Sequence, residues 1–176
     1  MEKKIIISGF GGQGIMSMGQ ILAASGMAEG KEVSWLPSYG PEMRGGSANC
    51  SVIISDQPIG APNVTKADSL IVMNEPSLEK FEENLVEGGN LYINSSLIGL
   101  KPKRDDINVY YIAVNELANE VSPKSLNMVM LGAFQKIENL IDEKNLWEGF
   151  SKVYGEKAEK IIDINKKAYQ MGYNSL

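Results

Sequence analysis

A cluster of glycines directly after a short apolar run constrains this chain more than any other feature. The run Ile5-Ile6-Ile7 is β-branched and stops at Gly9, which is typical of a strand buried on both faces of a sheet. The glycines follow the G-x-G-x-x-G spacing, and helical periodicity begins at Ile15. Glycine accepts a positive φ in a tight turn and lets backbone N–H groups at a helix start approach an anion. The sequence therefore predicts a strand, a ligand-binding turn and a helix, and the candidate binding residues are Gly9, Gly11, Gly12, Gln13 and Gly14.

Strand and helix patterns alternate over the first two thirds of the chain, and helical patterns fill the rest. Strands are expected at 4–8, 32–36, 48–54, 70–73, 91–94 and 109–113, and a turn at 56–58 is expected to form a hairpin with Ile59. Helices are expected from 15 to a stop at Gly30, then at 76–86 with Gly88-Gly89 as its stop, and at 116–121, 126–140, 143–154 and 156–171. The alternation predicts one α/β domain over residues 1–176. We expect it to be Rossmann-like, with a mostly parallel sheet, helices on both faces and a helical C-terminal end.

Composition excludes several classes of function. The chain has 176 residues and a net charge of −5, so nucleic acid and anionic membranes are not expected partners. Its one cysteine, Cys50, rules out an internal disulfide and a cysteine-ligated iron–sulfur cluster built from this chain alone. The chain has no histidine, so general base catalysis would fall to carboxylates, Lys or Tyr, and metal sites to oxygen ligands; no catalytic or metal-ligating residue is predicted. The N-terminus has no signal-peptide pattern and no apolar run approaches the ~20 residues of a membrane span, so a cytoplasmic location is expected.

The glycine loop lacks two features of nucleotide-binding enzymes. A nicotinamide site needs a carboxylate about 20 residues on to hold the ribose, yet the second strand ends without one and the first acid is Glu42. No Walker lysine follows the loop, which disfavours nucleotide hydrolysis. The alternative that the glycines only close a tight strand-to-helix turn stays open.

A second glycine-rich segment follows the second predicted strand. In a doubly wound sheet it would lie at the same carboxyl edge as the first loop, where ligands bind. Arg44 could clamp a phosphate or carboxylate, Glu42 could orient it, and Tyr39 could stack or donate. The competing interpretation is a surface loop with a solvated Glu–Arg pair. Two such loops at one edge favour a binding surface, which adds the candidates Ser38, Tyr39, Gly40, Glu42, Arg44, Gly45 and Gly46.

Four segments together resemble a known family. They are GFGGQG at 9–14, SYGPEMRGG at 38–46, SANC at 47–50 and NMVMLGA at 127–133. Their pairing resembles the gamma subunit of 2-oxoacid:ferredoxin oxidoreductases, and the resemblance runs through most of the chain. The first loop looks more like the 2-oxoglutarate branch than the pyruvate branch.

The resemblance implies part of an enzyme complex. Assemblies of this family oxidatively decarboxylate a 2-oxoacid, form an acyl-coenzyme A and reduce ferredoxin, with thiamine diphosphate, Mg and Fe–S clusters on sister subunits. It implies alpha and beta partner subunits, with a ferredoxin-like delta subunit as a further candidate partner. This chain is expected to bind no cofactor tightly, to offer its loops near coenzyme A, and to be inactive alone. Two alternatives are a stand-alone nucleotide- or flavin-binding reductase and a non-catalytic ligand-binding scaffold.

Several further side chains are expected to be structural. Met128 and Met130 on one predicted helix, Cys50 on a strand, and Trp35 and Trp147 are all predicted to fill the core. Lys and Glu residues around 156–167 fit the solvated side of an amphipathic helix.

Overall fold

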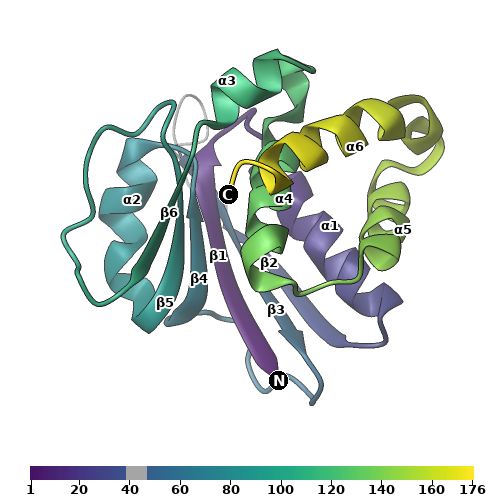
Figure 1. The fold of residues 1–176 in the computed structure, drawn as a ribbon. Helices are drawn as coiled ribbons and strands as arrows, with labels where there is room; N and C mark the ends of the chain where they lie inside the picture. Colours follow the sequence, from purple (N-terminus) through teal and green to yellow (C-terminus); the bar gives the residue numbers. More distant parts are fainter. Residues whose placement is uncertain (39–46) are drawn as a thin grey trace.

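Strands and helices alternate from the N-terminus, as the sequence predicts (Figure 1). The computed structural model describes residues 1–38 and 47–176. The strands of these residues are β1 (Glu2–Phe10), β2 (Glu32–Ser38), β3 (Ser47–Ser55), β4 (Ala67–Val72), β5 (Leu85–Asn94) and β6 (Asn108–Ile112). The helices are α1 (Ile15–Ala28), α2 (Glu75–Phe81), α3 (Val114–Asn119), α4 (Leu126–Glu138), α5 (Glu143–Tyr154) and α6 (Ala158–Tyr173).

These strands form one sheet in the order β2-β3-β1-β4-β5-β6. β1 pairs in parallel with β4, β4 with β5 and β5 with β6, whereas β3 runs antiparallel to both β1 and β2. β2 therefore points the same way as β1, and the carboxyl ends of β1, β2, β4, β5 and β6 share one edge. The expected mostly parallel α/β sheet is confirmed, and β3 is its antiparallel member.

Two apolar cores lie on opposite faces of the sheet. Ile5 and Ile7 of β1 belong to the core beneath α1 and α4–α6, whereas Ile6 belongs to the core beneath α2. Figure 1 shows these two groups of helices on opposite sides of the sheet. Burial on both faces explains the uninterrupted Ile5-Ile6-Ile7 run. Because the parallel neighbours β1 and β4 are followed by helices on opposite faces, the gap between their carboxyl ends is the switch point of this sheet.

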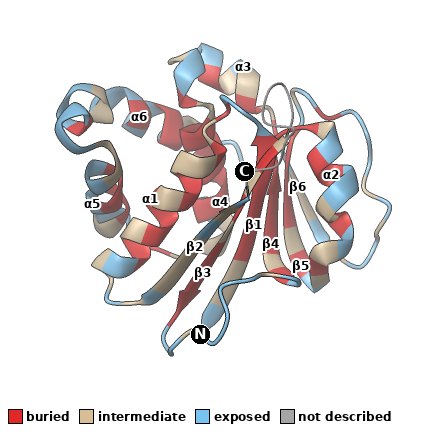
Figure 2. Ribbon diagram, turned by 180° about the vertical axis from the view of Figure 1, so that it is seen from behind, coloured by how far each residue is buried: buried red, intermediate tan, exposed pale blue. Residues whose placement is uncertain are grey.

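Burial follows the layers, with buried residues along the central strands and exposed residues on the outer faces of α5 and α6 (Figure 2). Cys50, Met128 and Met130 are fully buried and Trp147 is 8% exposed, which confirms them as core residues. Trp35 is only partly buried and packs against the same core. Residues 156–167 are mostly exposed, as expected for a solvated helix face.

Small residues bring the helices close to their neighbours. A Cβ on Gly19 of α1 would lie 2.6 Å from Cys50 Sγ, so the helix packs directly on β3. A Cβ on Gly132 of α4 would lie 2.9 Å from Tyr173 N, and one on Gly172 of α6 would lie 2.6 Å from the carbonyl carbon of Val129. Glycine is therefore required where the α4 and α6 backbones touch.

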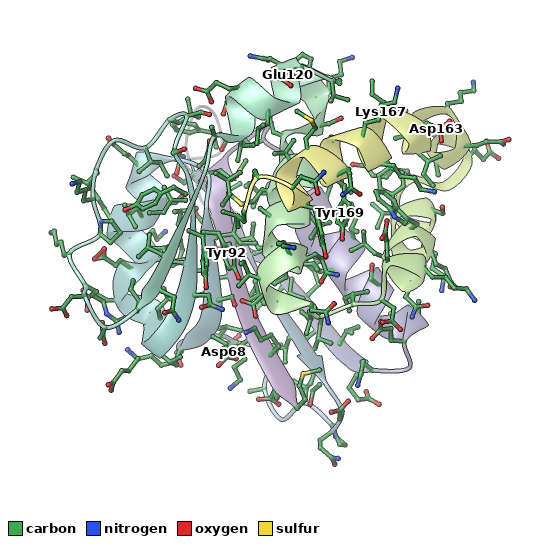
Figure 3. All side chains as sticks on the ribbon, viewed as in Figure 1. Asp68, Tyr92, Glu120, Asp163, Lys167 and Tyr169 are labelled. Carbon is green, nitrogen blue, oxygen red and sulfur yellow. The ribbon has the colours of Figure 1, made fainter. Side chains whose placement is uncertain are left out.

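A buried carboxylate ties the end of α4 to the sheet. Glu138 Oε1 accepts hydrogen bonds from Ser69 Oγ (2.5 Å), Asn90 Nδ2 (2.9 Å) and Tyr92 OH (2.8 Å), and Oε2 pairs with Lys3 Nζ (2.6 Å). Tyr92 lies between the sheet and α4 (Figure 3). Burial would raise the pKa of Glu138, but these hydrogen bonds outweigh it and hold the pKa below its ordinary value.

Two local expectations are wrong. The helix expected at 76–86 is α2 followed by a 3-10 turn at Glu82–Asn84, but Gly88-Gly89 lies inside β5 instead of closing that helix. Gly88 has a φ of 76° and its N–H donates to Asp106 O, so the pair forms an irregularity where the β4–β5 register shifts. The chain after 56–58 forms no hairpin with Ile59, because β3 already pairs with β2 on one side and β1 on the other.

Candidate ligand-binding loop

The loop from Gly9 to Gly14 joins β1 to α1 at the carboxyl edge of the sheet. Gly12 and Gly14 have positive φ values of 91° and 77°, a backbone conformation that favours glycine. Gly14 is also the residue before the first turn of α1, and its carbonyl accepts from Met18 N at 2.9 Å. The spacing thus encodes a sharp turn that aims the start of α1 at the carboxyl edge.

Gln13 fills the switch point between β1 and β4. Its Oε1 accepts from Phe10 N at 2.6 Å, and its Nε2 donates to Met73 O at 3.2 Å. The side chain is 7% exposed, so it closes the gap in which a doubly wound fold usually binds its ligand. A Cβ on Gly9 would lie 2.5 Å from Gln13 Oε1, which explains why Gly9 must be glycine. The backbone N–H of Gln13 also donates to Phe10 O at 3.3 Å, so both its side chain and its N–H are bound within the chain.

The other end of the loop rests on α4. Asn127 Nδ2 donates to Gly14 O at 3.4 Å, and a Cβ on Gly14 would lie 2.6 Å from that same nitrogen. Gly9 and Gly14 are therefore needed for packing, whatever the loop binds. A Cβ on Gly12 would meet no atom of residues 1–38 and 47–176 within 4 Å, so among these residues only its φ requires glycine.

A hollow of about 320 Å³ opens on the α1 and β3 side of the loop, away from the gap that Gln13 fills. Within the described residues, the backbone N–H groups of Ile15, Met16 and Ser17 donate to no other group, as is usual in a first helical turn. No acidic side chain lies in that turn, so nothing there opposes an anion. The hollow is lined by Phe10, Gly11, Gly12, Gly14, Ile15, Met16, Ser17 and Ala48.

The structure adds residues that the sequence analysis did not name as candidates for the site. Phe10, Met16, Ser17 and Ala48 line the hollow, and Asn127 supports Gly14 from a helix more than 100 residues later. The first three stand in or next to the glycine motif, so its helical context could have indicated them. Ala48 and Asn127 depend on the pairing of β3 with β1 and on the docking of α4, which no local pattern encodes.

The second predicted loop falls largely outside the described residues. Tyr39, Gly40, Glu42, Arg44, Gly45 and Gly46 all belong to it. Ser38 is described: it ends β2, is exposed and pairs in register with Asn49. Ser47, where β3 begins, pairs with Phe10 at the start of the glycine loop. Both ends of the segment therefore meet the sheet at the edge that carries the first loop.

Other kinds of chemistry find little support in the described residues. Burial raises the pKa of Cys50 to about 12, which keeps its thiol protonated and unreactive. No group of three or more Cys, Asp or Glu side chains in residues 1–38 and 47–176 is placed to hold a metal ion. No described helix combines the length and the apolar character that crossing a bilayer requires.

Fold and loop together define an α/β domain with an anion-compatible helix start beside a hollow. Residues 4–175 match the family described as pyruvate ferredoxin/flavodoxin oxidoreductase. The chain belongs to this family, and it is of the gamma-subunit type. The resemblance noted from the sequence is thereby confirmed.

Three relatives show the range of the family. The 2-oxoglutarate synthase subunit KorC of Methanocaldococcus jannaschii is 37% identical over 150 residues, covering 83% of this chain and 80% of that subunit. The gamma subunit of a keto/oxoacid ferredoxin oxidoreductase from Geobacter sulfurreducens has a TM-score of 0.82 at 30% identity, covering 98% and 96% of the two chains. A chain of the 2-oxoglutarate:ferredoxin oxidoreductase of Magnetococcus marinus, solved with 2-oxoglutarate, coenzyme A and succinyl-CoA bound, has a TM-score of 0.88 at 27% identity.

Some relatives are much longer than this chain. The structural match covers 99% of this chain but only 31% of the Magnetococcus chain. Likewise this chain spans 36% of the ketoisovalerate oxidoreductase subunit VorA of Methanothermobacter marburgensis, at 35% identity over 173 residues. The same domain therefore occurs as a short subunit and as about a third of a longer one.

Proposed function

We propose that this chain is the gamma subunit of a multi-subunit 2-oxoacid:ferredoxin oxidoreductase, and that its glycine loop contacts coenzyme A. The observation that carries the second part is the hollow beside the first turn of α1, whose N–H groups donate to no group in the described part of the chain. A helix start of this kind suits a phosphate, and coenzyme A carries phosphates at one end.

In this proposal the residues of the chain bind and orient, and take no part in electron transfer. The N–H groups of Ile15, Met16 and Ser17 would receive the phosphate oxygens. The turn held by Gln13 and Asn127 would keep these donors aimed at the carboxyl edge. Arg44, if it lies beside them, would add a charge-assisted contact.

Redox and carbon–carbon bond cleavage would then fall to sister subunits. This chain has one cysteine, and its thiol is buried, so its residues do not fit an iron–sulfur cluster. We infer that alpha and beta subunits hold thiamine diphosphate, Mg and the clusters, that a ferredoxin-like delta subunit can join them, and that ferredoxin accepts the electrons. The proposed place of action is the cytoplasm.

For the 2-oxoacid we propose 2-oxoglutarate. The identity to the KorC subunit and the likeness to the Magnetococcus oxidoreductase support this choice. Ketoisovalerate is the second candidate, favoured by the VorA relative that matches 97% of this chain.

The test is a reconstituted complex supplied with coenzyme A and a ferredoxin-type acceptor. We expect coenzyme A-dependent reduction with 2-oxoglutarate exceeding that with ketoisovalerate or pyruvate, and no turnover by the isolated chain. Turnover by the isolated chain would contradict the subunit assignment. A complex that prefers ketoisovalerate would overturn the substrate choice alone.

A further inference from the structure

A second hollow, of about 460 Å³, lies far along the chain from the glycine loop. It forms where α6 passes the short turn at 123–125 that precedes α4, and it shares no lining residue with the first hollow. Its volume falls within the range of ligand pockets, roughly 300–1,000 Å³. Nothing in the proposed function uses it.

The floor of this hollow is polar and ordered by internal hydrogen bonds. Ser125 Oγ donates to Asn165 Oδ1 at 3.0 Å, and Asn165 Nδ2 donates to Ile161 O at 2.9 Å. Ser125 is 2% and Asn165 9% exposed, so both are fixed below the surface. Ser125 Oγ keeps a lone pair, and Asn165 Nδ2 keeps one proton, for a further partner.

The walls are apolar and the rim is cationic. Ile161 and Ile164 of α6 line the hollow with Tyr154, and Ile164 is 38% exposed although it is a large apolar side chain. Lys124 and Lys160 stand at the rim, and neither ammonium pairs with a carboxylate in the part of the chain that the structure describes. No lining residue is acidic, although the whole chain carries a net charge of −5.

We propose that this hollow binds a small organic anion, a carboxylate or phosphate monoester attached to a short apolar body. The apolar body would pack on Ile161 and Ile164, and the anionic group would lie between Lys124 and Lys160. The chemistry needs both parts: a bare anion would leave the isoleucines exposed, and an uncharged chain would leave the lysines unpaired. A bound anion would accept the second Nδ2 proton of Asn165, whose Oδ1 holds Ser125, two residues before the Asn127 that supports the glycine loop.

The test uses the full chain with ¹³C-labelled isoleucine methyl groups, observed by NMR. Hexanoate and hexyl phosphate are the two probes, and they distinguish a carboxylate from a phosphate ligand. Hexanol and inorganic phosphate are the controls that carry only the tail or only the charge. We expect saturable shifts of the Ile161 and Ile164 methyl signals with at least one probe, and none at Ile98, which lies in the core on the other face of the sheet.

Substitutions check that the hollow itself is responsible. Lys124→Gln with Lys160→Gln should weaken probe binding about five- to tenfold, because two exposed ion contacts are lost. Lys167→Gln is the matched control: Lys167 projects outward from α6 (Figure 3) and does not line the hollow, so affinity should not change.

Three results would overturn the proposal. They are the absence of saturable shifts, equal binding of hexanol or inorganic phosphate, and unchanged affinity in the double lysine variant. Loss of probe binding once sister subunits are added would also overturn it, because the hollow would then be a subunit interface.

Discussion

Removing the buried carboxylate of Glu138 should destabilise the isolated chain more than any single surface change. In Glu138→Ala the buried hydroxyls of Ser69 and Tyr92 lose their acceptor, and each such loss costs about 1–3 kcal/mol. The side chain of Lys3 is 20% exposed and can turn toward water, so the loss of its ion pair with Glu138 adds little to the cost. We expect the free energy of unfolding to fall by about 3 kcal/mol, which corresponds to about 6–12 °C in Tm at this chain length.

Glu138→Gln removes the negative charge of this side chain but keeps its size and shape. The amide keeps one oxygen acceptor for the hydroxyl donors but turns a donor toward Lys3 Nζ, so we expect about half the effect of alanine. Glu148→Gln is the control, since Glu148 is half exposed and its nearest approach to Lys152 is 3.9 Å; its effect should stay below about 0.5 kcal/mol. Urea unfolding followed by circular dichroism measures all three.

The same network predicts a pH dependence. Because the pKa of Glu138 is lowered in the folded state, its contribution is present above the ordinary carboxyl pKa and is lost as pH falls through the folded value. The stability difference between wild type and Glu138→Gln should therefore shrink as pH drops from 7 to below 4. A difference that is constant over this range, or an alanine variant as stable as wild type, would refute the reasoning.

Two further predictions concern packing. Gly132→Ala should lower the free energy of unfolding by about 1–3 kcal/mol or more, because its Cβ would meet the α6 backbone. Gly60→Ala should be neutral in the same urea titration, because its Cβ would meet no described atom within 4 Å. Cys50 should resist iodoacetamide in the folded chain at pH 8 and react on unfolding, as mass spectrometry would report; rapid native labelling would mean that β3 is not covered by α1.

Periodicity and glycine placement indicated most of the fold. Ile5-Ile6-Ile7 marked a strand buried on both faces, and the residues of α5 were expected at the bounds the structure shows. Gly88-Gly89 misled because a glycine pair after a helical pattern resembles a helix stop, while here it permits an irregular strand. The antiparallel β3 lies between β1 and β2 because of long-range strand pairing, which no local sequence pattern predicts.

The candidate site was only partly predictable. The motif located the turn, but the structure separates its glycines by physical role: Gly9 for packing, Gly12 for its φ, and Gly14 for both. That Gln13 fills the switch point follows from Met73 O lying beside it, a contact 60 residues apart in sequence. No sequence pattern indicated that the carboxylate of Glu138 contacts the sheet, because an acid at the end of a helix usually faces water.

The most direct test of the central claim is Gly11→Ala in the assembled complex. Gly11 lines the first hollow and, unlike Gly12 and Gly14, does not have a positive φ, so alanine adds no backbone strain there while its methyl group intrudes on a ligand. Gly30→Ala, at a φ of 77° outside the hollow, shows what backbone strain alone does, at roughly 1 kcal/mol. The account predicts that Gly11→Ala keeps its Tm and its co-purification with sister subunits while the KM for coenzyme A rises about tenfold, or about 1.4 kcal/mol. An unchanged KM, or a loss of activity that only follows a loss of folding or assembly, would contradict it.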